Sequence, residues 1–377
     1  MYQSSNPRPQ RVAGWGQFRV GDGTTVLARD NRRLELNGGG TAGITPKVVA
    51  KVLEACDGSR DVDDVVGHVL NTHPGVSPGA VRRLVDQLAQ KHIVVDAAAP
   101  VPAGLTADEL ASYRRHIAYY SDFETETTSR YDYLARLKRA KVVIIGLGGA
   151  GSLMAASLAS SGVRRIVGID GDIVEETNLH RQLFYLPEDV DRYKADALAE
   201  RLTQRLPDLA FTAVSKYVMN GQDLEEHIEG ANLVIHMGDF PPRQSRVTTT
   251  EACLKAGIPS LHFFNTWCGP LCLPGESACF GCYEQAANQV HAGFEQISAS
   301  IDAKGPYSPR TRPGVNLWMM GIATSEAVGF LSGTRRPATV DGMIAVDPVA
   351  GQSQRIPLQR SPVCRLCSPS AHLQESR

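Results

Sequence analysis

The chain has 377 residues, which is enough for two or three domains and a sizeable core. Its hydrophobic content of 42% and charged content of 21% are those of an ordinary soluble globular protein. The formal net charge of -1 gives no global basic field, so we expect neither nucleic acid nor a membrane as a partner. The first residues lack the apolar segment of a secretory signal, so we expect a cytoplasmic protein whose eight cysteines are metal ligands or free thiols.

The N-terminal part of the chain has the pattern of a small α+β module over residues 1–96. Short alternating stretches between residues 16 and 38 predict strands separated by Gly and Asp turns. Apolar residues at helical spacing then predict three helices, with Thr45 and Ser77 placed as N-caps, and "HIVVD" predicts a closing strand. This order predicts a winged-helix-like domain. An Ala/Pro-rich linker over residues 97–114 follows it.

The third segment, residues 115–377, alternates strand and helix patterns from Lys141 onward. Short apolar strands alternating with helices predict an α/β fold with a doubly wound, mainly parallel Rossmann-like sheet. The most apolar segment, residues 142–161, contains several glycines and is interpreted as a buried βα unit. After Pro259 we expect a strand, a long loop, a helix over residues 316–331 and two late strands.

The stretch "KVVIIGLGGAGS" predicts a strand that leads into a glycine-rich turn and a helix. Gly146, Gly148 and Gly151 form a G-x-G-x-x-G pattern that also includes Gly149. Glycines let the backbone approach a phosphate, and the helix N-terminus supplies unpaired N–H groups. Asp170 ends the next predicted strand and is placed to accept hydrogen bonds from a ribose. These features alone fit a dinucleotide cofactor as well as ATP.

The residues downstream favour ATP. Negative charge develops on the phosphate oxygens during attack at the α-phosphorus, and cationic and polar groups stabilise it. The chain supplies these candidate ATP ligands in order after the ribose acid: Asp172, Asn178, Arg181, Gln182 and Lys194. Asp239 ends another predicted strand, where a Mg²⁺ ligand would lie. An NAD-dependent oxidoreductase is the disfavoured alternative, because hydride transfer does not need these cations.

Taken together, "VVIIGLGGAG", "GIDGDIVEETNLHRQ", "YKADAL" and "GDF" resemble the ThiF/MoeB/HesA superfamily of adenylating enzymes. The resemblance implies that Asp170 holds the ATP ribose, that Asn178, Arg181 and Lys194 contact phosphates, and that Asp239 binds Mg²⁺. It also implies a homodimer in which an arginine before the glycine loop reaches into the partner's site. Arg115 is the first choice for this arginine, with Arg114 and Arg130 as alternatives. Together with Arg181, Lys194 and Asp239, Arg115 forms the predicted catalytic set.

Two C-x-x-C pairs predict a structural Zn²⁺ site. Cys279 and Cys282 form "CFGC", and Cys364 and Cys367 form "CRLC". Four thiolates complete a tetrahedral zinc site and leave no position for a catalytic water. The superfamily resemblance implies a zinc at this place as well.

The remaining cysteines are expected to play lesser roles. Cys56 and Cys253 lie on apolar helix faces and are predicted to belong to the core. The loop over residues 283–313 contains no cysteine, so we expect no thioester relay. A catalytic role for Cys268 or Cys272 stays open.

Two further resemblances narrow the function. "LEACDGSRDVDDVV" resembles the PqqD-like recognition element, which holds the leader of a ribosomally made peptide by adding it to a sheet edge. The segments "GPLCLPGESACFGCYE" and "RSPVCRLC" resemble the microcin-C-type peptide adenylyltransferases, although "PSLHFFNTWCGP" is shorter than its counterpart there. This difference leaves the fate of the adenylate open: AMP stays on the product, or it leaves during dehydration or cyclisation.

The sequence therefore favours ATP-dependent adenylation of a carboxylate, or of a C-terminal amide residue, on a ribosomal precursor peptide. Two alternatives remain. One is activation of a ubiquitin-like sulfur carrier, and the other is a non-catalytic peptide-binding scaffold. The alternative for the N-terminal module is a purely structural one, in which it is a small domain that contributes to dimer packing.

Overall fold

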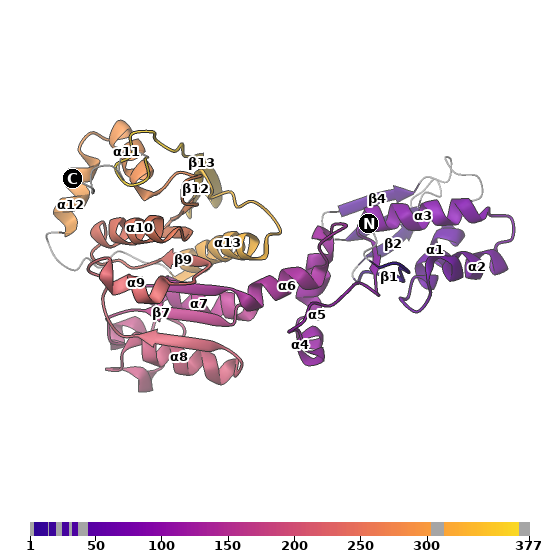
Figure 1. The fold of residues 1–377 in the computed structure, drawn as a ribbon, viewed down its shortest axis with the longest axis horizontal. Helices are drawn as coiled ribbons and strands as arrows, with labels where there is room; N and C mark the ends of the chain where they lie inside the picture. The colour runs from indigo at the N-terminus through magenta and orange to yellow at the C-terminus, as the bar shows by residue number, and fades with distance from the viewer. Residues whose placement is uncertain are drawn as a thin grey trace. The chain divides into compact units, whose positions relative to one another are not determined.

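The computed structural model describes residues 4–13, 15–19, 25–29, 32–36, 44–302 and 313–368. The chain divides into two compact units, Met1–Ala135 and Arg136–Arg377 (Figure 1). The boundary between the units lies after Ala135, downstream of the expected functional division at residues 114 and 115.

The predicted helices of the first unit are α1 (Pro46–Ala55), α2 (Val62–Thr72) and α3 (Pro78–Gln90). Each begins at a side-chain cap: Thr45, Asp61 and Ser77 accept a hydrogen bond from the third following backbone N–H. Their apolar faces form one buried cluster with Trp15 and Leu27 from the strand region. Amphipathic spacing and caps therefore account for this helical core.

The strands of the first unit are β1 (Pro9–Arg11), β2 (Gly16–Arg19), β3 (Thr25–Arg29), β4 (Arg32–Leu36) and β5 (Val94–Asp96). An antiparallel sheet has the order β2-β3-β4, and β1 pairs with β5. The predicted strand and helix elements are therefore present. The winged-helix-like assignment stays a prediction.

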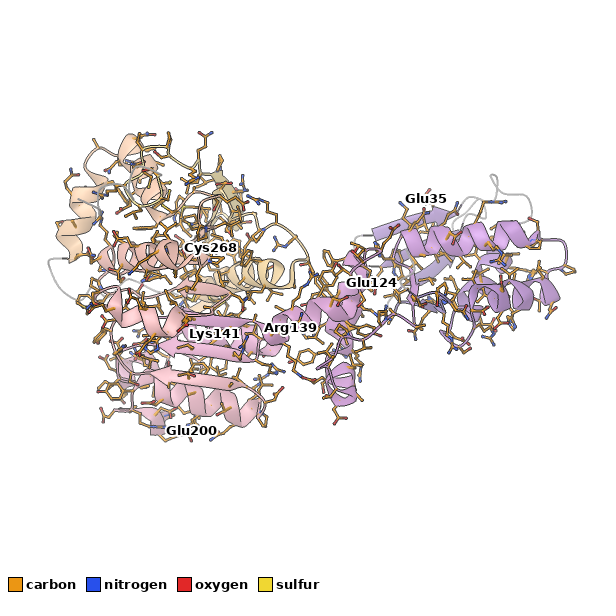
Figure 2. All side chains as sticks on the ribbon, in the orientation of Figure 1. Glu35, Glu124, Arg139, Lys141, Glu200 and Cys268 are labelled. Carbon is orange, nitrogen blue, oxygen red and sulfur yellow. The ribbon has the colours of Figure 1, made fainter. Side chains whose placement is uncertain are left out.

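Helix α4 (Ala107–Ser112) lies within the expected linker of residues 97–114, and α5 (Arg114–Tyr120), the 3₁₀ turn η1 (Ser121–Phe123) and α6 (Arg130–Arg139) follow it. Arg130 donates to the Asp96 carbonyl oxygen at 3.0 Å and to Glu124, labelled in Figure 2, at 2.8 Å. Arg29 of β3 pairs with Asp122. These contacts attach the segment after residue 97 to the N-terminal module.

In the described part of the second unit, the strands are β6 (Lys141–Ile145), β7 (Arg165–Ile169), β8 (Ala210–Val214), β9 (Leu233–His236), β10 (Ser260–Phe264), β11 (Trp267–Cys272), β12 (Gly342–Asp347) and β13 (Gln352–Pro357). They form one sheet in the order β13-β12-β11-β10-β9-β6-β7-β8. The strands β10, β9, β6, β7 and β8 run parallel, and β11 to β13 extend the sheet in antiparallel fashion. The predicted mainly parallel α/β sheet is confirmed, with an antiparallel edge.

The sheet is covered by helices on both faces (Figure 1). The helices and turns are α7 (Gly149–Ser161), η2 (Glu176–Asn178), η3 (Pro187–Asp189), α8 (Lys194–Arg205), α9 (Gln222–Ile228), α10 (Gln244–Ala256), α11 (Phe280–Val290), α12 (Phe294–Asp302) and α13 (Pro313–Ser332). Helices α9 and α10 share a buried apolar cluster with β6, β7 and β9, whereas α13 packs against α7. None of the helices in the described ranges is long and apolar enough to span a membrane.

The predicted long loop after Pro259 is wrong. Strand β11 pairs with β10 and β12, and α11 and α12 occupy part of the segment expected to be a loop. Gly269 and Pro270 hide the strand in the sequence, because these residues are depleted in strands, yet pairing on both sides overrides this local preference. Residues 303–312 of the same expected loop lie outside the described residues.

Candidate active site

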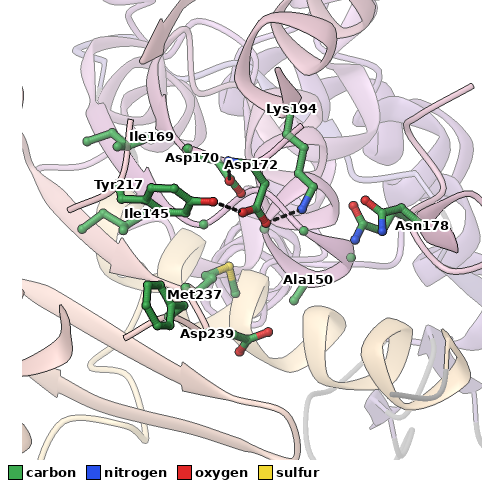
Figure 3. Close-up of a pocket in the computed structure, with 18 of the residues that line it drawn as sticks. Ile145, Ala150, Ile169, Asp170, Asp172, Asn178, Lys194, Tyr217, Met237 and Asp239 are labelled. Atoms are coloured by element: carbon green, nitrogen blue, oxygen red, sulfur yellow. Dashed lines mark hydrogen bonds and ion pairs between the residues drawn. The ribbon is translucent and has the colours of Figure 1, made fainter. Parts of the chain in front are cut away.

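A cavity of about 850 Å³ opens at the carboxyl ends of the parallel strands (Figure 3). Strand β6 lies between β7, which follows it in the chain, and β9, which returns from the far side of the sheet. This reversal is a topological switch point, where open α/β sheets bind ligands. The predicted residues that line the cavity are Gly146, Gly148, Gly149, Gly151, Asp170, Asp172, Asn178, Arg181, Gln182, Lys194 and Asp239.

The glycine loop packs too closely for any other side chain at two positions. Gly146 has a φ of +86°, and a Cβ there would lie 2.6 Å from the backbone of Gly238. A Cβ on Gly151 would lie 1.8 Å from the Gly146 carbonyl oxygen. The first contact brings the end of β6 against the end of β9. The second lets α7 begin directly under the loop, so its N-terminal N–H groups face the cavity.

Asp170 is held at the end of β7 by two backbone N–H groups. The N–H of Leu147 donates to one carboxylate oxygen at 2.6 Å, and the N–H of Asp172 donates to the other at 2.8 Å. Burial raises the pKa of Asp170, while the Lys194 charge pulls it down. The carboxylate is therefore fixed between the glycine loop and β7, where a ribose hydroxyl of a bound nucleotide would approach it.

Asp172 lies between a cation and a phenol. The Lys194 ammonium donates to one of its oxygens at 2.6 Å, and the Tyr217 hydroxyl donates to the other at 2.5 Å (Figure 3). Burial alone would raise the pKa of Asp172, but these two bonds and the Lys194 charge lower it. The same hydrogen bond raises the pKa of Tyr217. Lys194 itself is 6% exposed, so Asp172 provides the partner that a nearly buried ammonium requires.

Asn178, Arg181 and Gln182 face the cavity from the β7–α8 connection. Asn178 and Gln182 are buried, and the Gln182 Oε1 atom has no hydrogen-bond partner among the described residues. The Arg181 guanidinium donates to the Thr177 carbonyl oxygen at 2.5 Å. The Tyr185 hydroxyl donates to the Leu147 carbonyl oxygen at 2.7 Å and ties the connection to the glycine loop. Polar groups thus converge near the N-terminus of α7, as binding of an anion there requires.

The Asp239 carboxylate points into the cavity from the end of β9 (Figure 3). It has no hydrogen-bond or ion-pair partner among the residues that the structure describes. Partial desolvation raises its pKa, while the charges of Arg246 and Lys194 lower it. A carboxylate oxygen that faces a phosphate-sized cavity without a protein partner fits a Mg²⁺ ligand.

The arginines expected to act on a partner's site lie in the first unit. Arg114 and Arg115 are on α5, and both are exposed. Arg130 is 4% exposed, and its guanidinium is bound to Glu124 and to the Asp96 carbonyl oxygen. Arg130 therefore supports its own unit, and Arg114 and Arg115 remain as the available guanidinium groups of this set.

The four predicted zinc ligands meet in one buried cluster. The sulfurs of Cys279, Cys282, Cys364 and Cys367 all lie within 4.8 Å of one another. Cys279 and Cys364 are 3.7 Å apart, and Cys282 and Cys367 are 3.5 Å apart. A tetrahedral zinc site with Zn–S bonds of about 2.3 Å needs sulfurs about 3.8 Å apart, whereas a disulfide needs about 2.05 Å. The donor set and its spacing therefore fit zinc.

The other cysteines are buried thiols. Cys56 and Cys253 belong to apolar clusters, as predicted for core residues. Cys268, labelled in Figure 2, and Cys272 lie on β11, and burial raises the pKa of both, to about 12 for Cys272. A nucleophilic cysteine needs a lowered pKa and access to substrate, and neither residue has them.

Several residues of the cavity escaped the sequence analysis: Lys216, Tyr217, Phe240, Asn265 and Asn316. Tyr217 and Phe240 follow the ends of β8 and β9, and their rings meet edge to face at 6.3 Å. A strand-end position was the one available signal for them. Asn316 lies on α13 and approaches Gly149, a contact that depends on tertiary packing alone.

Sequence comparison identifies the family. The ThiF family model matches residues 113–366, and the chain belongs to this family. The sulfur carrier protein ThiS adenylyltransferase of Escherichia coli (strain K12) is 29% identical over 240 residues, which is 62% of this chain and 88% of that protein. The molybdopterin-synthase adenylyltransferase of the same organism is 26% identical over 277 residues, which is 70% of this chain and 99% of that protein. The chain is an ATP-dependent adenylyltransferase.

Solved structures share the fold along nearly the whole chain. The microcin C7 biosynthetic enzyme MccB in complex with N-formylated MccA superposes with a TM-score of 0.76 and 20% identity, covering 96% of this chain and 99% of that chain. E. coli MccB with ATP gives a TM-score of 0.74 at 19% identity and covers the same shares. PaaA gives a TM-score of 0.71 at 21% identity and covers 92% of this chain and 99% of that chain.

Proposed function

We propose that the chain adenylates a carboxylate, or a C-terminal amide residue, of a ribosomally synthesised precursor peptide. The N-terminal unit carries this proposal. The two E. coli adenylyltransferases align with 62% and 70% of this chain, although 88% and 99% of their own lengths are aligned. The likeness to MccB covers 96% of this chain, and MccB has been solved with MccA bound. Sulfur-carrier enzymes therefore work without the N-terminal module, whereas an enzyme solved with a bound peptide shares it.

The first unit offers a sheet edge for an extended peptide. Strands β2 and β4 each pair on one side only among the described residues. A leader peptide that adds to such an edge gains backbone hydrogen bonds without a specific sequence match. Binding there raises the local concentration of the reacting end near the cavity.

In the second unit, each predicted residue has a role that its surroundings support. Gly146, Gly148 and Gly151 leave space for the triphosphate over the N-terminus of α7, and Asp170 accepts from the ribose. Asn178, Arg181, Gln182 and Lys194 contact phosphate oxygens. Lys194 exchanges part of its contact with Asp172 for the negative charge of the nucleotide. Preorganised donors of this kind stabilise charge that develops in the transition state.

The reaction needs no general base, because a carboxylate is already ionised at neutral pH. One carboxylate oxygen attacks the α-phosphorus and forms the acyl–phosphate bond. The bond from the α-phosphorus to its bridging oxygen breaks, and pyrophosphate leaves with that electron pair. Mg²⁺, when bound by Asp239, offsets the charge of the leaving phosphates. Alignment of the two reactants and the charge of Arg181 and Lys194 supply the rest.

We also propose a homodimer and a structural zinc. Ile173, Leu183 and Leu186 of the β7–α8 connection are 43%, 53% and 40% exposed, and Ile173 also lines the cavity, so this connection presents apolar side chains that a partner could cover. In the proposed dimer, a second copy covers these side chains and supplies Arg115, or Arg114, to the site. Zinc held by the four cysteines would fasten α11 to the segment around Cys364, which β12 and β13 precede.

Pyrophosphate exchange tests the proposed function. The full chain is incubated with ATP, Mg²⁺, labelled pyrophosphate and candidate precursor peptides, and the mass of each peptide is followed. We expect exchange only with a peptide that carries the leader, and the mass shows whether AMP stays on the product. Asp239→Asn should abolish exchange and leave peptide binding unchanged. Exchange with a Gly-Gly carrier alone would support sulfur-carrier activation, and tight peptide binding without exchange would support a scaffold.

A further inference from the structure

Arg246 is a buried cation whose guanidinium reaches the connection that follows Asp239. It lies on α10 and is 5% exposed. Its guanidinium donates to the Phe263 carbonyl oxygen at 3.1 Å and to the Pro242 carbonyl oxygen. It also stacks over the Phe264 ring, 4.6 Å from the ring centre. Among the described residues no carboxylate lies within ion-pair distance of it, and its Nε atom has no hydrogen-bond partner.

The groups around Arg246 do not neutralise it. His236 and His262 are fully buried, and their Nε2 atoms are hydrogen-bonded to Ser245 and Thr250. Burial, reinforced by the charge of Arg246, lowers the pKa of both imidazoles, to about 3 for His262, so both are neutral. A buried cation without an ionic partner costs several kcal/mol, which points to a functional reason for its presence.

The two carbonyl contacts of Arg246 connect the segment after Asp239 to strand β10. Pro242 belongs to the connection that begins at Asp239 and leads into α10, and Phe263, the next-to-last residue of β10, lines the cavity. The Ser245 hydroxyl adds a third tie, since it donates to the Pro241 carbonyl oxygen at 2.5 Å.

We propose that Arg246 is a positioning residue for the carboxylate of Asp239. It fixes the 239–242 connection, which carries the proposed metal ligand, against the end of β10. The inference rests on the proposed role of Asp239. Groups that orient a metal ligand from behind typically change metal affinity by about 10- to 100-fold when they are replaced.

The test is the Mg²⁺ dependence of ATP binding, which needs no peptide. Calorimetric titration of the full chain with ATP is run in Mg²⁺ and in EDTA, for the wild type, Arg246→Lys, Arg246→Gln and Asp239→Asn. We expect Arg246→Lys to weaken ATP binding about tenfold in Mg²⁺ and less than about twofold in EDTA. Lysine keeps the charge but cannot span two carbonyl groups, so this variant still decides the question if Arg246→Gln does not fold.

Arg164→Lys is the matched control. Arg164 is also buried and donates to two backbone carbonyl groups, those of Ala159 and Val163, but it precedes β7 at the opposite end of the strands. The Arg164→Lys variant should leave ATP binding unchanged in both buffers. Equal losses in Mg²⁺ and EDTA for Arg246→Lys, or no loss at all, would overturn the inference. If Asp239→Asn shows no Mg²⁺-dependent loss, the metal role in the proposed function fails as well.

Discussion

Lys194 and Asp172 form an ion pair with a separation of 2.6 Å on the wall of the nucleotide cavity. The backbone repeats the connection, because the N–H of Lys194 donates to the Asp172 carbonyl oxygen at 2.9 Å. The start of α8 is therefore fixed to the end of β7 twice. The ammonium is held in place before any nucleotide arrives, so less ordering is left for the binding step.

Replacing Tyr217 by phenylalanine should change the pH dependence of stability. The Tyr217 hydroxyl bond lowers the pKa of Asp172 in the folded chain. A lowered pKa contributes stability above the unfolded value of about 3.9, and this stability is lost as the pH falls through the folded value. The variant should therefore be less stable than the wild type at pH 7, and the two should converge in acid.

Urea unfolding between roughly pH 3 and pH 7 measures this convergence. Tyr119→Phe is the control, since Tyr119 is 55% exposed and lies in the other unit. It should shift stability by little, and by the same amount at every pH. A constant difference between Tyr217→Phe and the wild type down to the acid limit would contradict the proposed coupling.

Alanine at Gly151 should disrupt the glycine loop. The added Cβ would lie 1.8 Å from the Gly146 carbonyl oxygen, so the loop has to move away from α7. We expect a loss of about 1–3 kcal/mol in the free energy of unfolding and loss of ATP binding. Gly321→Ala in α13 meets no atom within 4 Å and should instead stabilise the chain by about 0.5–1 kcal/mol. Unfolding curves and ATP titration distinguish the two, and unchanged ATP binding by Gly151→Ala would contradict the tight packing.

The sequence alone predicts the parts of the site that lie at the ends of parallel strands. Gly146 and Asp170 meet because parallel neighbouring strands end at the same edge of the sheet. The contact of Gly146 with Gly238 required knowledge that β9 returns beside β6, and the chain order alone does not give this. Arg246 was not predicted, because a charged residue on an expected helix gives no sign that it is buried.

The cysteine cluster should contain one zinc ion per chain. Because metal binding to such a cluster is coupled to folding, Cys282→Ser should lose the metal and lower the unfolding temperature by roughly 10 °C. Cys253→Ala, which removes a buried thiol outside the cluster, should keep the metal. Elemental analysis and calorimetry measure both effects. If the wild-type chain has the same unfolding temperature with and without zinc, a structural metal is ruled out.

A peptide-binding fragment should require the helices after the expected linker. A fragment of residues 1–114 loses Asp122 as the partner of Arg29 and Arg130 as the donor to the Asp96 carbonyl oxygen. Each lost bond to a charged group costs about 1.5–3 kcal/mol. A fragment of residues 1–139 keeps both contacts and all of α6. We expect cooperative unfolding and leader-peptide binding from the longer fragment, and equal stability of the two would show that the helices are dispensable.

The arginine that acts across the proposed dimer can be identified by mixing inactive chains. Arg115→Ala and Asp239→Asn should each abolish exchange. In a mixed dimer, the site of the Arg115→Ala chain keeps its own Asp239 and receives Arg115 from its partner, so one of the two sites works. Random mixing gives half mixed dimers, so about a quarter of the wild-type exchange rate should return.

The same mixture made with Arg114→Ala separates the two exposed arginines. The variant that is inactive alone but recovers exchange on mixing with Asp239→Asn identifies the arginine that acts across the dimer. Arg130→Ala should behave differently, because its guanidinium is bound within its own unit: it should lower the stability of that unit. If an inactive Arg115→Ala or Arg114→Ala chain recovers nothing on mixing, the arginine acts within its own chain, since a residue that serves its own site cannot be supplied by the partner.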